Sequence, residues 1–116
     1  MTQLSAHFKS SEFACRCGCG QSAVSEDLID LLEAIRTTVN KPVKITSGRR
    51  CLEHNTKCGG KPRSQHMLGN AADITVEGLS PKQLAAIIER KFKPAGMGVY
   101  KTFVHVDVRS GPHVRW

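Results

Sequence analysis

The chain is poor in aromatic residues and has no long apolar run, and both shortages exclude classes of protein. Only six of its 116 residues are aromatic, namely four Phe, one Tyr and one Trp, and no stretch interleaves them with basic residues. Proteins that bind single strands stack the bases on such aromatics, so we expect no nucleic-acid partner. A transmembrane helix requires about 20 consecutive apolar residues, and none is expected here.

The first residues also lack a basic segment followed by an apolar one, so we expect no secretory signal peptide. Action outside the cytoplasm would then need another route of release. Acidic residues are scarce as well, with 10 Asp and Glu against 17 Lys and Arg, for a net charge of +7. This balance favours an anionic partner such as nucleic acid, anionic lipid or cell-wall polymer, or else serves solubility alone.

The number of cysteines is odd: the chain has five, so they cannot all pair with one another in disulfide bonds. Without a signal peptide, reduced thiols are the default. Loop thiols, one disulfide bond and a second, structural metal site all remain open. The cysteines are Cys15, Cys17, Cys19, Cys51 and Cys58.

The length suits one domain, and we expect a single α+β domain over residues 1–116. Ser25 is a good helix N-cap and opens an apolar periodicity that ends at Asn40-Lys41-Pro42. Ser80-Pro81-Lys82-Gln83 is a capping box that predicts a second helix to about residue 92.

Four strands are predicted, and together with the two helices they indicate an α+β fold. β-Branched and alternating residues mark them at 43–46, 71–76, 97–100 and 103–108. Residues 5–13 should dock through Phe8 and Phe13, while 14–24 and 47–63 should be loops. The tail from Arg109 to Trp116 is not assigned to any element.

One stretch, from Ser64 to Asp73, brings a histidine and a carboxylate together. His66 and Asp73 stand seven positions apart, with Gly69 between them. Asp73 lies in an otherwise apolar run, and a buried carboxylate is costly without a cation or several donors. Asp73 therefore needs a partner.

The last predicted strand offers that partner. Alternation places Phe103, His105 and Asp107 on one face, opposite a valine face that suits the core. If this strand is a neighbour of 71–76, Asp73 and His105 can share one ion. Two histidines and one carboxylate are a common ligand set for catalytic zinc.

Two further residues could take part in chemistry. Asp107 could move protons, or it could instead orient a metal ligand. One arginine of the pair Arg49-Arg50, which follows Ser47-Gly48, could hold a substrate carboxylate or stabilise an oxyanion, unless the pair is only a solvated basic loop. The remaining histidines, His7, His54 and His113, are expected to be structural or surface residues.

The pattern Ser64-x-His66-x-x-Gly69-x-Ala71-x-Asp73 followed by His105-Val106-Asp107 resembles the M15 family of zinc peptidases. The nearest branch is similar to small phage and prophage endolysin-type members related to D-Ala-D-Ala carboxypeptidases. Residues 10–15, 46–51 and 98–100 agree with that resemblance.

The resemblance implies one catalytic zinc held by His66, Asp73 and His105. The fold that it implies has a small antiparallel sheet with two main helices, and is the α+β fold shared with hedgehog domains and D-Ala-D-Ala peptidases. It also implies that Arg50 contacts substrate or transition state and that Ser64 binds substrate. The expected substrates are peptide bonds in bacterial peptidoglycan stem peptides or cross-links. The expected protein is a monomer made in the bacterial cytoplasm and released onto the wall, as a phage lysin is.

Two departures separate this chain from its relatives. Arg49 replaces an aromatic residue of the arginine motif. Thr102 and Phe103 stand where some relatives carry the group that moves protons, so that role does not transfer. The alternative is therefore a non-catalytic zinc-containing module that binds cell wall or protein. A nucleic-acid-binding zinc protein built on the cysteines ranks last, because it leaves His66, Asp73 and His105 unexplained.

Overall fold

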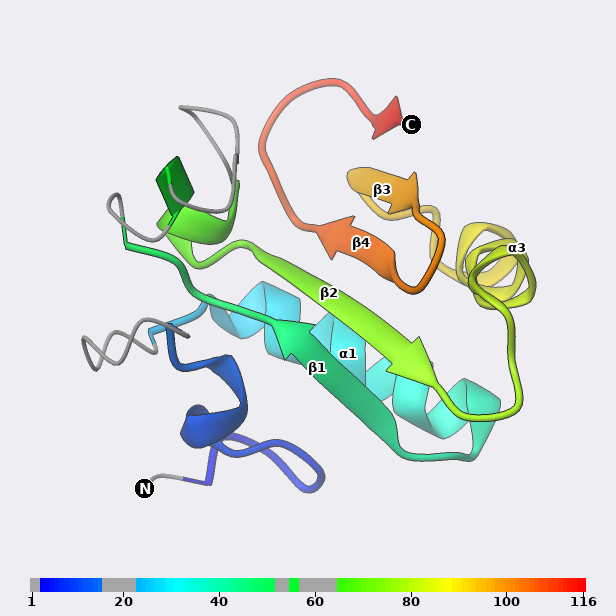
Figure 1. Cartoon of the computed structure of the whole chain (residues 1–116), viewed down its shortest axis with the longest axis horizontal. Coiled ribbons are helices and arrows are strands. Elements are labelled where there is room, and N and C mark those ends of the chain that lie inside the picture. The colour runs from blue at the N-terminus through cyan, green and yellow to red at the C-terminus, as the bar shows by residue number, and fades with distance from the viewer. Residues whose placement is uncertain (1–2, 16–22, 52–54, 57–64) are drawn as a thin grey trace.

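The architecture is a five-stranded mixed sheet with helices packed on one of its faces (Figure 1). The computed structural model describes residues 3–15, 23–51, 55–56 and 65–116. In chain order the elements are η1 (Ser10–Phe13), α1 (Glu26–Val39), β1 (Val43–Ser47), η2 (Gln65–Leu68), β2 (Ala71–Val76), α3 (Pro81–Lys91), β3 (Gly96–Val99), β4 (Val104–Asp107) and β5 (Val114–Arg115).

The strands lie in the order β1-β2-β4-β3-β5. The first four pair antiparallel with their neighbours, so the expected α+β fold with a small antiparallel sheet and two main helices is confirmed. β5 was not predicted and runs parallel to β3, with Gly96 opposite Val114. Two residues are too few for a periodic signal, which is why the tail stayed unassigned.

Both helices begin where the sequence places their caps. The Ser25 side chain accepts a hydrogen bond from the Leu28 amide at the start of α1, and Asn40 ends that helix with a left-handed φ of 53°. Ser80 and Gln83 form the reciprocal capping box of α3. These local signals fix the helix ends independently of tertiary packing.

One face of the sheet forms the hydrophobic core, and it is the face that α1 and α3 cover. Figure 1 shows α1 behind β1 and β2, with α3 beside β3 and β4. Phe8 and Phe13 are buried in the same core and anchor the N-terminal segment, as predicted. The principal core side chains are Leu28, Leu32, Ile35, Ile45, Ile74, Leu84, Ile88, Val104 and Val106.

Strand alternation sends the polar side chains of β2 and β4 to the opposite face. Asp73, His105 and Asp107 are nevertheless buried, since chain segments outside the sheet cover them. No helix among the described residues is long and apolar enough to cross a membrane.

Candidate metal centre

Strand register brings the two halves of the predicted site together. Asp73 of β2 lies directly opposite His105 of β4, and the short helix η2 places His66 beside them. The donor atoms of these three residues all lie within 4.8 Å of one another, and all three residues are buried. The Asp73 Oδ1 atom is 3.2 Å from His66 Nε2 and 3.1 Å from His105 Nδ1. This cluster could therefore hold a metal ion.

The outer nitrogen of His66 is already engaged. Its Nδ1 atom lies 2.7 Å from the Gly48 carbonyl oxygen. A carbonyl can only accept, so Nδ1 carries the proton and donates it. In the neutral ring the Nε2 lone pair then faces the Asp73 carboxylate.

The outer nitrogen of His105 is engaged in the same way. Its Nε2 atom lies 2.8 Å from Asp107 Oδ2. Burial, the largest single influence, raises the pKa of Asp107, but hydrogen bonds from Arg109 and His105 outweigh it and hold that pKa well below its usual range. The carboxylate is therefore ionised and accepts from Nε2, so a neutral His105 ring would present its Nδ1 lone pair to Asp73.

With both rings neutral, three acceptor atoms would converge on one buried point, where their like partial charges repel unless a proton or a metal cation lies between them. The pKa values respond accordingly. Burial favours the neutral carboxylic acid of Asp73, yet hydrogen bonds from His105 and His66 lower its pKa to about 2. Burial also opposes a charge on His105, but Asp107 and Asp73 together raise its pKa. A proton on His105 Nδ1 is donated to Asp73 in the absence of a metal, and a divalent cation could replace it.

Asp107 is enclosed on every side. Its Oδ1 accepts from the Arg109 amide at 3.2 Å and Nε at 2.9 Å, and its Oδ2 accepts from Arg109 Nη2 at 2.6 Å as well as from His105. The residue is fully buried, with 0% of its surface exposed. Gly96 faces it across the β3–β4 pair, and a Cβ at Gly96 would overlap the carboxylate. The missing side chain at Gly96 leaves the space that Asp107 fills.

Arg50 borders the cluster on the β1 side. Its Nη2 lies 3.4 Å from Asp73 Oδ2, while Nε and Nη1 reach Ser47 Oγ at 3.3 Å and Asn55 Oδ1 at 3.4 Å. A register shift in β1 places Ser47 opposite Asp73, and bulges of this kind often re-aim side chains beside active sites. The sequence reasoning did not identify Asn55.

Arg49, which replaces an aromatic residue of the motif, is directed elsewhere. Its Nη1 donates to the Ala23 carbonyl at 3.1 Å, and its amide donates to the Phe13 carbonyl at 2.8 Å. It therefore tethers neighbouring segments. The predicted substrate residue Ser64 lies outside the described residues, as do Cys17, Cys19, His54 and Cys58.

Trp116 completes the surroundings, and sequence reasoning missed it. Its ring centroid is 4.9 Å from that of His105, and the Arg109 Cζ atom lies 5.4 Å from the indole centroid. The indole Nε1 donates to Tyr100 Oη at 2.6 Å. A Cβ at Gly98 would overlap the indole. The available signals were a single tryptophan in the chain and glycines at alternate positions of β3.

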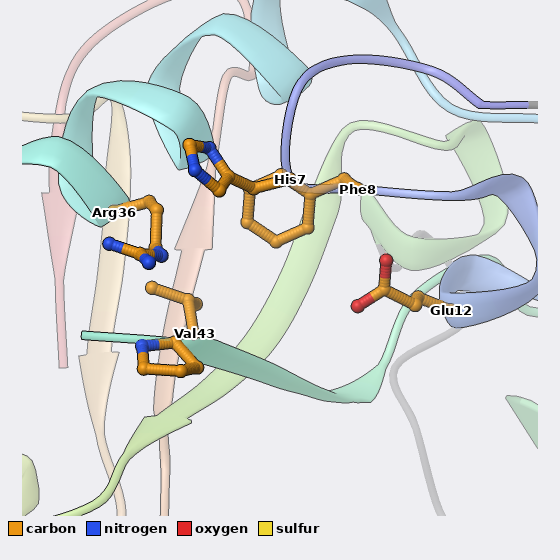
Figure 2. A pocket seen from close by; sticks show the side chains of 6 residues that line it. His7, Phe8, Glu12, Arg36 and Val43 are labelled. Atoms are coloured by element: carbon orange, nitrogen blue, oxygen red, sulfur yellow. The ribbon is translucent and has the colours of Figure 1, made fainter.

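The pocket in Figure 2 is separate from the cluster and shares no residue with it. The Phe8 ring lies between Arg36 and Glu12 in that view. His7, also at this pocket, pairs with Glu33, with Nδ1 and Oε1 2.6 Å apart, which fits its predicted structural role. The lining residues are His7, Phe8, Glu12, Arg36, Pro42 and Val43.

Comparison with known proteins agrees with the His-Asp-His geometry. A search of curated proteins gives no match to this chain. A family model described as Peptidase M15 matches residues 6–107, a range that contains η1, both helices, four strands and all three clustered side chains. Members of that family are typically zinc-dependent peptidases. The chain belongs to the peptidase M15 family.

Proposed function

We propose that this protein is a zinc-dependent peptidase that hydrolyses peptide bonds of bacterial peptidoglycan, in stem peptides or in cross-links. The proposed ligands of its single catalytic zinc are His66 Nε2, Asp73 Oδ1 and His105 Nδ1. One observation carries the proposal: each histidine donates its other ring N–H, to Gly48 or to Asp107, and so directs a lone pair at Asp73. Ligating histidines in zinc proteins have this second hydrogen bond almost without exception.

The donor set fits zinc rather than magnesium or calcium. Two imidazole nitrogens and one carboxylate oxygen are typical of catalytic zinc, whereas magnesium and calcium prefer oxygen ligands. When bound, zinc would polarise a substrate carbonyl and lower the pKa of a bound water to about 7. The chain itself supplies buried ligands whose orientation is set before any ion arrives.

Arg50 is the proposed substrate contact. Its three side-chain hydrogen bonds to described residues are 3.3 to 3.4 Å long, at the weak end of the range. A guanidinium held this loosely can turn toward a stronger acceptor, such as a peptide carboxylate or a developing oxyanion. Its contact with Asp73 would keep it beside the scissile bond.

Asp107 is proposed to position His105 rather than to carry protons. A general base needs a pKa near the working pH and access to a proton. Both oxygens of Asp107 accept two hydrogen bonds each, the residue is buried, and its pKa is lowered. Its geometry is that of a carboxylate that fixes a ligand's tautomer.

The proposal of a cell-wall substrate rests on chemistry as well as family. Peptidoglycan stem peptides and their termini carry carboxylates, which suit both Arg50 and a chain of net charge +7. Ser64 is the second proposed substrate contact. We further propose a monomer that acts on the wall after release from the cell.

The alternative is a non-catalytic module that keeps the zinc and binds wall or a protein partner. One feature favours it: Thr102 and Phe103 stand where some relatives have a proton carrier, and Asp107 is occupied. The two functions differ in a measurable way, because only the first releases fragments.

The test compares zinc-loaded wild type with His66→Ala on purified peptidoglycan, with mass spectrometry of the soluble products. His113→Ala is the matched control, because His113 is exposed and outside the cluster. The proposal expects peptide fragments from wild type and the control, and none from His66→Ala. Wall binding without any fragment, over several wall chemistries, would refute the peptidase and support the binding module.

A further inference from the structure

Trp116 presents a partly exposed aromatic ring beside His105, one of the clustered side chains. The two ring centroids lie 4.9 Å apart, yet 44% of the surface of Trp116 remains exposed. Figure 1 shows the chain turning back after β4, which brings β5 beside β3. The Trp116 amide donates to the Met97 carbonyl at 3.1 Å, and the Trp116 carbonyl accepts from the Val99 amide at 2.9 Å. Pairing with β3 therefore holds this ring at the edge of the site.

The neighbours of the indole fix its position. Gly98 lies opposite His105 in the β3–β4 register, and a Cβ at Gly98 would overlap the indole. A side chain there would therefore push the ring away from His105. The indole Nε1 donates to Tyr100 Oη at 2.6 Å, and the Tyr100 ring stacks on Phe103 with centroids 4.5 Å apart. The ring thus has a fixed place before any substrate arrives, which lowers the entropy cost of a contact with it.

The surface that the indole leaves open is apolar. Its single polar atom, Nε1, is already bonded to Tyr100, so the remainder of the ring is carbon. Arg109 borders the same ring, with Cζ 5.4 Å from the indole centroid, but its Nε and Nη2 atoms are bonded to Asp107. A group that packs on this ring is therefore selected by its apolar surface.

Trp116 and Arg50 lie on opposite sides of the clustered ligands. The strands run in the order β1-β2-β4-β3-β5. Arg50 contacts Asp73 of β2 from the β1 side, whereas Trp116 contacts His105 of β4 from the β5 side. A peptide whose carboxylate binds Arg50, with its scissile carbonyl at the cluster, would extend across the sheet toward Trp116. The residue that supplies the scissile carbonyl would then lie beside the indole.

We propose that Trp116 is a specificity-determining residue whose indole packs against the apolar side chain of the residue that supplies the scissile carbonyl. This inference rests on the proposed peptidase function and names the part of the peptide that the site selects. In a peptide ending in D-Ala-D-Ala, that side chain is a methyl group. One apolar group in an apolar subsite is worth about 10-fold or more in kcat/KM, so alanine should be preferred over glycine there.

The kinetic test uses synthetic peptides that contain the bond wild type cleaves in peptidoglycan. One pair differs as alanine or glycine before that bond, and a second pair carries the same change after it. Wild type should favour alanine about 10-fold in the first pair, Trp116→Ala should show no preference, and Trp116→Phe should keep most of it. Val99→Ala is the matched control, because Val99 is also exposed but pairs with Val104 on the other face of the sheet.

A merely structural role for Trp116 predicts a different result. Trp116→Ala would then weaken zinc binding, or slow all four peptides by the same factor, and the preference for alanine would stay as in wild type. Such a result would overturn the inference and leave the peptidase function standing. A Trp116-dependent preference that concerned the residue after the bond would also overturn it.

Fluorescence tests the contact without turnover, since Trp116 is the single tryptophan. The probe is a peptide ending in D-Ala-D-Ala, or an analogue with CH2–NH in place of the amide if wild type cuts it. Binding to the zinc-loaded protein should shift the emission to the blue, as the indole loses water, and the glycine counterpart should shift it less. Cleavage of peptidoglycan without any shift would overturn the contact alone. A shift without cleavage would refute the peptidase and keep the contact, and absence of both would refute both.

Discussion

Replacing Asp107 by asparagine separates its two possible roles, as base or as positioning group. Asparagine keeps the shape but removes the charge, so His105 Nε2 loses an ionised acceptor that lies 2.8 Å away, and Arg109 loses its bidentate partner. Positioning carboxylates of this kind are worth about 10- to 100-fold in metal affinity or activity. We therefore expect zinc affinity to fall by about 1.4 to 2.7 kcal/mol.

The assay measures zinc affinity and turnover on the same variant. Competition with a chromophoric chelator gives the zinc dissociation constant, and release of peptidoglycan fragments at saturating zinc gives the rate. We expect a weaker zinc site and a rate that recovers largely once the site is filled. His113→Ala should leave both quantities unchanged.

A general base behaves differently, because its loss costs about 100- to 10,000-fold in rate whatever the metal affinity. A variant with wild-type zinc affinity and a collapsed rate at saturating zinc would therefore refute the positioning role. An Asp107→Ala variant that binds zinc normally and cleaves at the wild-type rate would remove Asp107 from the account altogether.

Three further predictions address the surroundings of the site and the stability of the fold. Gly96→Ala places a Cβ on the Asp107 carboxylate and should cost about 1 to 3 kcal/mol in urea unfolding, whereas Val99→Ala on the same strand, a truncation at an exposed side chain, should cost less. Trp116 is the single tryptophan and its ring lies 4.9 Å from that of His105, so cobalt should quench its fluorescence in wild type; equal quenching at equal cobalt in His66→Ala would contradict this. Burial is the largest single influence on the pKa of Glu33 and raises it, but hydrogen bonds from Ser5 and His7 hold that pKa below 4.5. The ionised Glu33 therefore stabilises the fold above about pH 4.5, and this contribution is lost as the pH falls through the lowered pKa. Glu33→Gln should flatten this part of the stability profile, and an unchanged acid dependence would count against the Ser5–His7–Glu33 contacts.

The core of the candidate site could be predicted because its signals are local. A buried aspartate in an apolar run needs a cation or several hydrogen-bond donors, which singled out Asp73. Strand alternation set His105 and Asp107 apart from the valines that face the core. The structure confirms the pairing of Asp73 with His105.

The remainder depends on contacts that no local pattern encodes. The Gly48 carbonyl that fixes the His66 tautomer is 18 residues away in sequence. From the sequence, Asp107 could serve as a group that moves protons. In the structure the chain turns after β4, and Arg109 donates hydrogen bonds to both carboxylate oxygens of Asp107. Trp116 reaches His105 only because β5 pairs with β3, and a two-residue strand leaves no periodicity to detect.

The most direct test of the central claim is a crystal structure of the zinc-loaded protein with anomalous data collected at the zinc edge. The account predicts a peak bonded to His66 Nε2, Asp73 Oδ1 and His105 Nδ1, at about 2.0 to 2.2 Å from each, with the Gly48 and Asp107 hydrogen bonds intact. Absence of zinc from that point at saturating metal would contradict it, and so would ligation through His66 Nδ1 or His105 Nε2.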